Sequence, residues 1–219
     1  MPSPPLPPPL PPAERTVGQL VAESMRLYGR RFWPSLALGV PPSILNVLAR
    51  TLDDRTLLVV VPVVGGLLLS ASYLGAVALA AERPVRIWQP LLGGLLVFLP
   101  VPILAALFLL PALVWLAAIG LIVPVLALER VGFGFGFLRA YKLGRADFVH
   151  ALGSLATLAI LVFLTQSGLF FILRGTSDQT LAIASFVASL VVSPLLFLGA
   201  ALLYFDQEAR ENVKRVSRR

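Results

Sequence analysis

Residues 128–148 read LERVGFGFGFLRAYKLGRADF, and this stretch inserts charged side chains between two long apolar segments. The charged residues in it are Glu129, Arg130, Arg139, Lys142, Arg145 and Asp147. Residues 87–128 before it and residues 149–173 after it contain no Asp, Glu, Lys or Arg. Each apolar segment is long enough to cross a bilayer, which needs about 20 such residues. The alternation predicts an integral membrane protein whose charged stretch lies outside the hydrocarbon layer.

The composition of the whole chain points the same way. Hydrophobic residues make up 58% and charged residues only 13% of the 219 residues, whereas a soluble domain carries about 25% charge. The net charge of +7 comes without any nucleic-acid-reading motif, so we predict contact with membrane lipid and no nucleic-acid binding. There is no cysteine, which excludes disulfides, thiolate metal sites and a cysteine nucleophile.

Charge-free runs predict an all-α integral membrane protein with six transmembrane helices. The predicted spans cover residues 33–49, 57–81, 88–109, 111–128, 148–173 and 179–205. Residues 87–128 must fold back on themselves, because a single helix of that length would extend about 63 Å. We expect that turn near residues 109–112, at Pro111. The pair Pro41-Pro42 predicts a kink or a broken helix in the first span.

Two amphipathic helices, at about residues 16–32 and 136–147, are predicted to lie in the headgroup layer on the cytoplasmic side. In the first, Thr16 and Gln19 fit a capping box. Packing of this helix on the protein itself is the alternative. The alternating Gly and Phe residues 132–137 predict a flexible connector, because glycine discourages regular elements.

The remaining segments complete the domain organisation. Residues 1–12 are rich in proline and are predicted to form a disordered tail. Residues 13–207 form a single helical membrane domain, and residues 208–219 a basic cytoplasmic tail.

The distribution of basic residues predicts the orientation. Six spans place both termini on one side, and of the 18 Lys and Arg residues only Arg50, Arg55 and Arg174 fall on the other side. Basic residues collect in the cytoplasmic loops of membrane proteins. We therefore predict a plasma-membrane protein with both termini in the cytoplasm.

Residue combinations that perform chemistry are scarce. The only histidine is His150, and no carboxylate or second histidine falls within a span, while a zinc site takes three or four ligands. No GxSxG occurs, and GFGFGF does not match the GxGxxG of a nucleotide loop. We predict a protein that is not an enzyme, with no catalytic residue, no metal site and no cofactor. An intramembrane enzyme, which ranks last, would need polar side chains clustered around His150 or Glu129.

Three stretches resemble a known family: LYGRRFWPSL at 27–36, PVLALERVGFGFGFLRAYKLGRADF at 124–148 and LLYFDQEARE at 202–211. They resemble the glycerophosphoryl diester phosphodiesterase membrane domain, a family of bacterial six-span proteins of unknown function, over about residues 13–212. The resemblance implies a location in the bacterial inner membrane. In this family the phosphodiesterase domain is a separate barrel with its own histidines and carboxylates. Residues 13–212 do not contain such a barrel.

Particular residues carry that resemblance. They form a candidate structural motif of Glu129, Tyr204, Asp206 and Arg210. The family often has Ser where Ala140 stands and Arg where Glu208 stands, which weakens any role tied to those two positions.

The leading functional hypothesis is a non-catalytic membrane protein with a basic cytoplasmic face that contacts anionic lipid or a protein partner. The residues predicted to form that face are Arg26, Arg30, Arg31, Arg139, Lys142 and Arg145. The alternative is a transporter or lipid-handling permease for a neutral or amphipathic solute, suggested by the Pro41-Pro42 break. A cavity reaching mid-membrane beside Asn46 would favour the alternative. Partners and homo-oligomers stay open.

Overall fold

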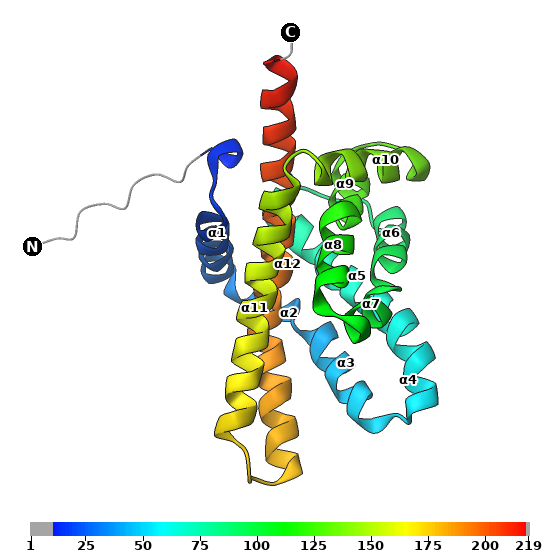
Figure 1. Ribbon diagram of the computed structural model, residues 1–219, viewed down its shortest axis with the longest axis vertical. Coiled ribbons are helices and arrows are strands. Elements are labelled where there is room, and N and C mark those ends of the chain that lie inside the picture. Colours follow the sequence, from blue (N-terminus) through cyan, green and yellow to red (C-terminus); the bar gives the residue numbers. More distant parts are fainter. Residues whose placement is uncertain (1–10, 218–219) are drawn as a thin grey trace, which may run out of the picture.

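The computed structural model describes residues 11–217, apart from the side chains of residues 54, 55 and 58. Every regular element in that range is a helix (Figure 1). Six helical segments are long and apolar enough to cross a membrane: Phe32–Thr51, Val61–Ala81, Trp88–Leu107, Leu109–Leu128, Phe148–Ile172 and Asp178–Val216. By length and composition, this confirms six predicted spans. The predicted tail at 1–12 lies outside the described residues except for Pro11 and Pro12.

The first helices follow the predicted pattern closely. After a 3-10 turn, η1 (Pro12–Glu14), helix α1 (Val17–Arg30) begins at the predicted capping box, in which Thr16 and Gln19 each bond the other's backbone N–H. The side chains of Leu20, Ser24 and Leu27 on α1 are buried, and the helix packs against the last two long helices, α11 (Phe148–Ile172) and α12 (Asp178–Val216).

The predicted break in the first span is confirmed. Helix α2 (Phe32–Ala37) stops at Leu38, and α3 (Val40–Thr51) starts after Gly39. The prolines lie in the first turn of α3, where a missing N–H leaves no helical bond unmade. A Cβ built on Gly39 would lie 2.0 Å from the carbonyl oxygen of Leu190 in α12. Pro194, inside α12, has no N–H to donate to that carbonyl.

The second span is one continuous helical path. Helix α4 (Asp54–Val60) begins at Asp53, whose side chain accepts from the Thr56 backbone N–H. A π-helical turn, η2 (Val61–Gly65), joins it to α5 (Gly66–Ala81). Glu82 then takes a left-handed conformation, with φ of 52°, and ends the helix.

The third and fourth spans form the predicted hairpin, but the turn lies at Phe108, just before residues 109–112. The first arm of the hairpin comprises α6 (Trp88–Phe98) and α7 (Val101–Leu107). The second arm comprises α8 (Leu109–Ile119) and α9 (Ile122–Leu128). Phe108 is extended, with φ of −162° and ψ of 150°. Pro111 falls in the first turn of α8, where proline starts a helix instead of ending one.

The prediction of a flexible connector at residues 132–137 is wrong, because helix α10 (Phe133–Gly144) already begins there. Tertiary packing explains the difference. A Cβ on Gly136 would lie 2.5 Å from the Leu126 side chain, and one on Gly144 would lie 2.6 Å from the carbonyl oxygen of Ala117. These glycines let α10 pack closely on α8 and α9, which offsets their low helix propensity. The helix ends at Gly144, short of the predicted residue 147.

The helix of the sixth span continues past the predicted end of the span at residue 205, because α12 runs to Val216. At about 1.5 Å per residue, its 39 residues extend about 58 Å, well beyond a hydrocarbon layer of about 30 Å. The last turns of α12 project past the rest of the bundle, whereas its earlier turns lie beside α11 (Figure 1).

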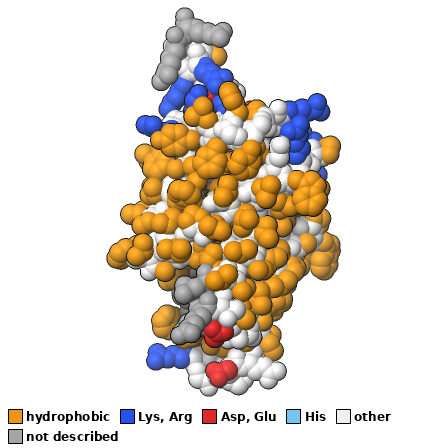
Figure 2. Space-filling view, turned by 90° about the vertical axis from the view of Figure 1, so that its right-hand side faces the viewer, with side chains coloured by type: hydrophobic (Ala, Val, Ile, Leu, Met, Phe, Trp, Pro, Cys, Tyr) orange, Lys and Arg blue, Asp and Glu red, His pale blue; other side chains and the backbone are white. Residues whose placement is uncertain are grey.

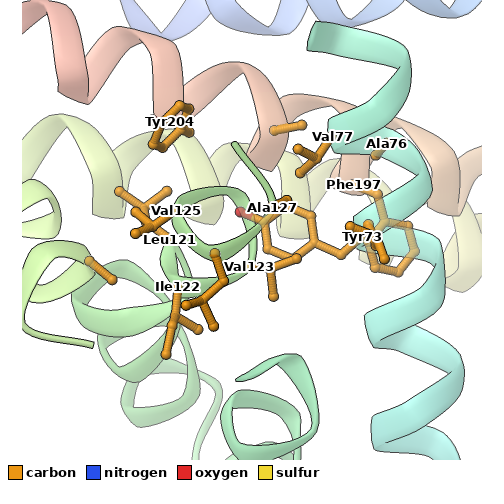
Figure 3. Close-up of a cluster of buried hydrophobic side chains, with 14 of the residues drawn as sticks. Tyr73, Ala76, Val77, Leu121, Ile122, Val123, Val125, Ala127, Phe197 and Tyr204 are labelled. Atoms are coloured by element: carbon orange, nitrogen blue, oxygen red, sulfur yellow. The ribbon is translucent and has the colours of Figure 1, made fainter. Parts of the chain in front are cut away.

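An apolar core lies between α5, α9 and α12. In Figure 3, Tyr73 and Val77 from α5 lie near Val123 and Val125 from α9 and Phe197 from α12, all of them buried. The outside of the bundle is apolar as well. Figure 2 shows a broad hydrophobic band with charged side chains gathered above and below it. In Figure 1, α10 lies across the long axis of the bundle, next to α9.

Replacing Gly39 by alanine tests the close approach of α3 to α12. Because a Cβ there would overlap backbone that cannot rotate away, we expect Gly39→Ala to lower the free energy of unfolding by more than about 1 kcal/mol. Unfolding of the purified protein in detergent, followed by circular dichroism, measures this. Gly168→Ala is the control, because nothing lies within 4 Å of a Cβ on Gly168; equal stabilities of the two variants would contradict the packing.

Candidate functional site

Polar side chains on the last third of α12 hold the neighbouring loops at one end of the bundle. They form two groups. The Asp206 cluster consists of Arg15, Asp147, His150, Asp206, Gln207 and Arg210. The Glu129 cluster consists of Glu129, Arg139, Tyr204, Glu211 and Arg215.

A buried ion pair lies at the centre of the Asp206 cluster. Asp206 has no exposed surface, and its Oδ1 accepts a hydrogen bond of 3.0 Å from Nη1 of Arg15, whose side chain is 13% exposed. A second guanidinium, that of Arg210, donates to Oδ2 of Asp147 at 2.6 Å and to the carbonyl oxygen of Arg15 at 2.5 Å. Two cations and two carboxylates thus neutralise one another across η1, α11 and α12.

His150 bridges the two ion pairs. Its Nδ1 lies 3.4 Å from Nη2 of Arg210, and because a guanidinium only donates, this nitrogen must accept. The other ring nitrogen, Nε2, faces Oδ2 of Asp206 at 3.6 Å. That distance is too long for a hydrogen bond, so the interaction between the ring and Asp206 is electrostatic.

Asp147 begins α11 and connects it to α12. Its Oδ1 accepts from the His150 backbone N–H at 3.1 Å as the helix cap, and its backbone N–H and carbonyl both bond the Gln207 amide at 2.9 Å. Partial burial raises the pKa of the Asp147 carboxyl, but the His150 N–H and the Arg210 guanidinium outweigh that effect, and its pKa is lowered overall. Asp147 is therefore a carboxylate at neutral pH.

The Glu129 cluster ties α10 to α12. Nε of Arg139 lies 3.2 Å from both carboxylate oxygens of Glu129, and the same guanidinium bonds Glu211. The Tyr204 hydroxyl donates to Glu129 at 3.0 Å. Burial lowers the pKa of Arg139, but Glu129 and Glu211 outweigh it and raise the pKa overall. Arg139 is therefore charged, and its guanidinium is occupied by the ion pairs with Glu129 and Glu211.

All four residues of the candidate structural motif belong to these clusters. Glu129 and Tyr204 bond each other, while Asp206 and Arg210 are brought together around His150. Arg15 and Gln207 also belong to the clusters and did not stand out in the sequence, whereas Glu211 is one of the residues that carry the family resemblance. Asp147 directly precedes the apolar run of α11, as an N-cap residue does. In contrast, no sequence pattern near Arg15 indicates that it pairs with Asp206.

The predicted basic face divides into two parts. On α1, Arg26 and Arg30 lie 2.8 Å and 3.6 Å from Glu23, and Arg31 pairs with Glu82 at 2.9 Å. Two carboxylates, Glu23 and Glu82, thus pair with three arginines. Within the described residues, these arginines share no carboxylate partner with the basic residues of α10.

The basic residues of α10 instead meet the end of α12. Arg139 and Lys142 line a surface pocket of about 350 Å³ with Arg215. Arg145 lines an adjoining pocket of about 240 Å³ with Lys214 and Arg215. We call the four residues Lys142, Arg145, Lys214 and Arg215 the basic end group.

Across the described residues 11–217, no three His, Asp or Glu side chains lie close enough together to hold a metal ion. No family model, curated protein or solved structure matches the chain. The resemblance to the phosphodiesterase membrane-domain family stays a prediction.

Removing the charge of Asp206 tests the ion pair at the centre of its cluster. Asp206→Asn leaves the Arg15 guanidinium buried without a counter-charge, so we expect a loss of about 3 kcal/mol in the free energy of unfolding. Glu23→Gln removes a carboxylate from the more exposed pair on α1 and should cost less than about 1 kcal/mol. Detergent-solubilised variants are compared by denaturant titration, and similar losses for both would show that Asp206 has no special role.

Proposed function

We propose that this protein is a non-catalytic, six-span protein of the bacterial inner membrane that binds anionic lipid headgroups at its cytoplasmic end. The basic end group carries this proposal. It places four cations, from α10 and α12, around two adjoining surface pockets.

The charge balance of this group leaves cations available to a ligand. Arg139 and Arg215 pair with Glu129 and Glu211, and Lys214 donates to the carbonyl oxygen of Ala146. Among the described residues, Lys142 and Arg145 pair with no carboxylate; the Arg145 guanidinium stacks over the Tyr141 ring at 5.5 Å. Lys142 and Arg145 therefore have no carboxylate partner within the described part of the chain and lie beside the two pockets, where they can bind phosphate groups.

Exposed apolar residues beside these cations support a membrane ligand over a soluble one. Phe135 is 70% exposed, and Leu138 and Tyr141 are also exposed on α10. A helix with exposed aromatic residues and adjacent Lys and Arg suits the boundary between headgroups and acyl chains. On this proposal α10 is the interfacial helix, and α1, with its buried Leu20, Ser24 and Leu27, packs on the protein.

A lipid-handling permease is the second candidate. The first span is broken before Pro41-Pro42, and a cavity of about 290 Å³ is lined by Ser185, the hydrogen-bond partner of Asn46. Discontinuous helices beside a cavity occur at the substrate sites of transporters.

Reporter fusions test the orientation. With both termini in the cytoplasm, a reporter active only in the periplasm should be active after Asp53 and inactive after Arg145, because the two cytoplasmic loops and both termini carry 15 of the 18 Lys and Arg residues, and the other side carries only Arg50, Arg55 and Arg174. A reporter active only in the cytoplasm provides the complementary control. Activity of the periplasmic reporter at Arg145 but not at Asp53 would show that the protein has the opposite orientation. The basic end group would then not be cytoplasmic, and the proposal would fail.

Charge removal tests the headgroup site. The double variant Lys142→Gln/Arg145→Gln should bind phosphatidylglycerol about 10- to 30-fold more weakly, because each cation near an anionic surface contributes about 1 kcal/mol. Native mass spectrometry of the full chain in neutral detergent, titrated with this lipid, measures the affinity. The control Arg26→Gln/Arg30→Gln removes the same charge from α1 and should change binding less than threefold. Equal weakening in both variants would show that net charge alone attracts the lipid.

A further inference from the structure

The cavity of about 290 Å³ lies at the opposite end of the bundle from the basic end group. Its lining comes from the last turns of α3 and α11 and the first turns of α12. The polar side is formed by Arg50, Gln166, Ser167 and Ser185, and three phenylalanines of α11 lie on its apolar side. The cavity therefore has a cationic rim and an aromatic wall. These two surfaces are complementary to an amphipathic ligand with an anionic group and an apolar part.

The cation at the rim is held in place by two helices. Nε of Arg50 donates to Oδ1 of Asn46 at 3.3 Å, and Nδ2 of Asn46 donates to the Ser185 hydroxyl of α12 at 3.1 Å. A guanidinium carries five N–H donors, and only the Nε donor is engaged in this way. Among the described residues, Arg50 pairs with no carboxylate. It therefore presents a positioned charge and free donors to the cavity.

The wall on α11 is open to the bilayer. Phe163 is 62% exposed and Phe171 67% exposed, and Phe170 between them is also exposed. Contiguous exposed aromatic surface on a membrane helix is covered by acyl chains. The chains of a bound lipid could continue along this wall while its headgroup enters the cavity.

The depth of the polar residues fits the boundary of the hydrocarbon layer. Helix α11, with 25 residues, is about 37 Å long and exceeds the hydrocarbon thickness of about 30 Å. Gln166 lies six residues before the end of α11 at Ile172, or about 9 Å along the axis. Arg50 is the residue before the last of α3. Arg50 thus lies near the level of the headgroups, and Gln166 lies just inside the boundary of the hydrocarbon layer.

We propose that this cavity binds the headgroup of one anionic phospholipid of the outer leaflet. The phosphate is bound by Arg50 with Gln166 and Ser167, and an acyl chain lies along the phenylalanines of α11. At about 290 Å³ the cavity is at the small end of ligand sites, so it takes a headgroup and leaves the chains in the bilayer. The inference rests on the proposed membrane topology and is independent of the basic end group.

Native mass spectrometry of the full chain in neutral detergent tests this site with phosphatidylglycerol and with phosphatidylcholine of the same acyl chains. We expect Arg50→Gln to weaken phosphatidylglycerol binding about tenfold, the value of one charge-assisted hydrogen bond. Arg174→Gln is the matched control, because it removes the same charge at the same end without lining the cavity, and it should change binding less than threefold. Gln166→Glu, a nearly isosteric change, should weaken binding at least fivefold by repulsion.

Several outcomes would overturn the proposal. Equal effects of Arg50→Gln and Arg174→Gln would show non-specific attraction, and equal binding of the two lipids would show that the headgroup charge is not recognised. Displacement of the lipid by millimolar inorganic phosphate would identify a soluble anion as the ligand. Circular dichroism confirms folding, and Gln166→Glu decides the matter if Arg50→Gln does not fold. The Lys142→Gln/Arg145→Gln variant should lose the phosphatidylglycerol of the basic end group but still bind one at Arg50, so the number of lipids bound per protein separates failure here from failure at the other end.

Discussion

A carboxylate without exposed surface needs a counter-charge nearby, and Asp206 imposes that requirement on the whole end of the bundle. A lone buried charge is far more costly than a paired one, so Arg15 must reach α12 from the beginning of the described chain. Arg210 then bonds the carbonyl of Arg15 and the carboxylate of Asp147. One buried charge therefore positions η1, α1 and the start of α11 together.

Much of the fold follows from short-range patterns in the sequence. The six spans, the capping box at Thr16 and the break before Pro41 depend on hydrophobicity, side-chain capping and the missing proline N–H, which act over a few residues. The start of α10 could not be predicted this way. Its glycines are unfavourable in an isolated helix, and the close approaches of Gly136 to Leu126 and of Gly144 to Ala117 offset that cost.

The site was predictable in part, for a similar reason. The motif residues Glu129, Tyr204, Asp206 and Arg210 were identified from the sequence, and they interact at one end of the bundle. Their partners were not, because Arg15 and Asp206 are 191 residues apart and no periodic pattern links them. Conversely, Glu23 and Glu82 pair with the arginines at residues 26–31, and a count of positive charges alone does not show these ion pairs.

Pro194 removes one backbone hydrogen bond near the middle of α12, and the helix bends most easily there. The carbonyl of Leu190 lacks its usual helical donor there, and Gly39 approaches it from the gap between α2 and α3. Two helices thus have their weakest backbone bonding at one shared level. Ser185 lies on one side of that level and Asp206 on the other, so Pro194 separates the half of α12 that lines the cavity from the half that carries the ion pairs.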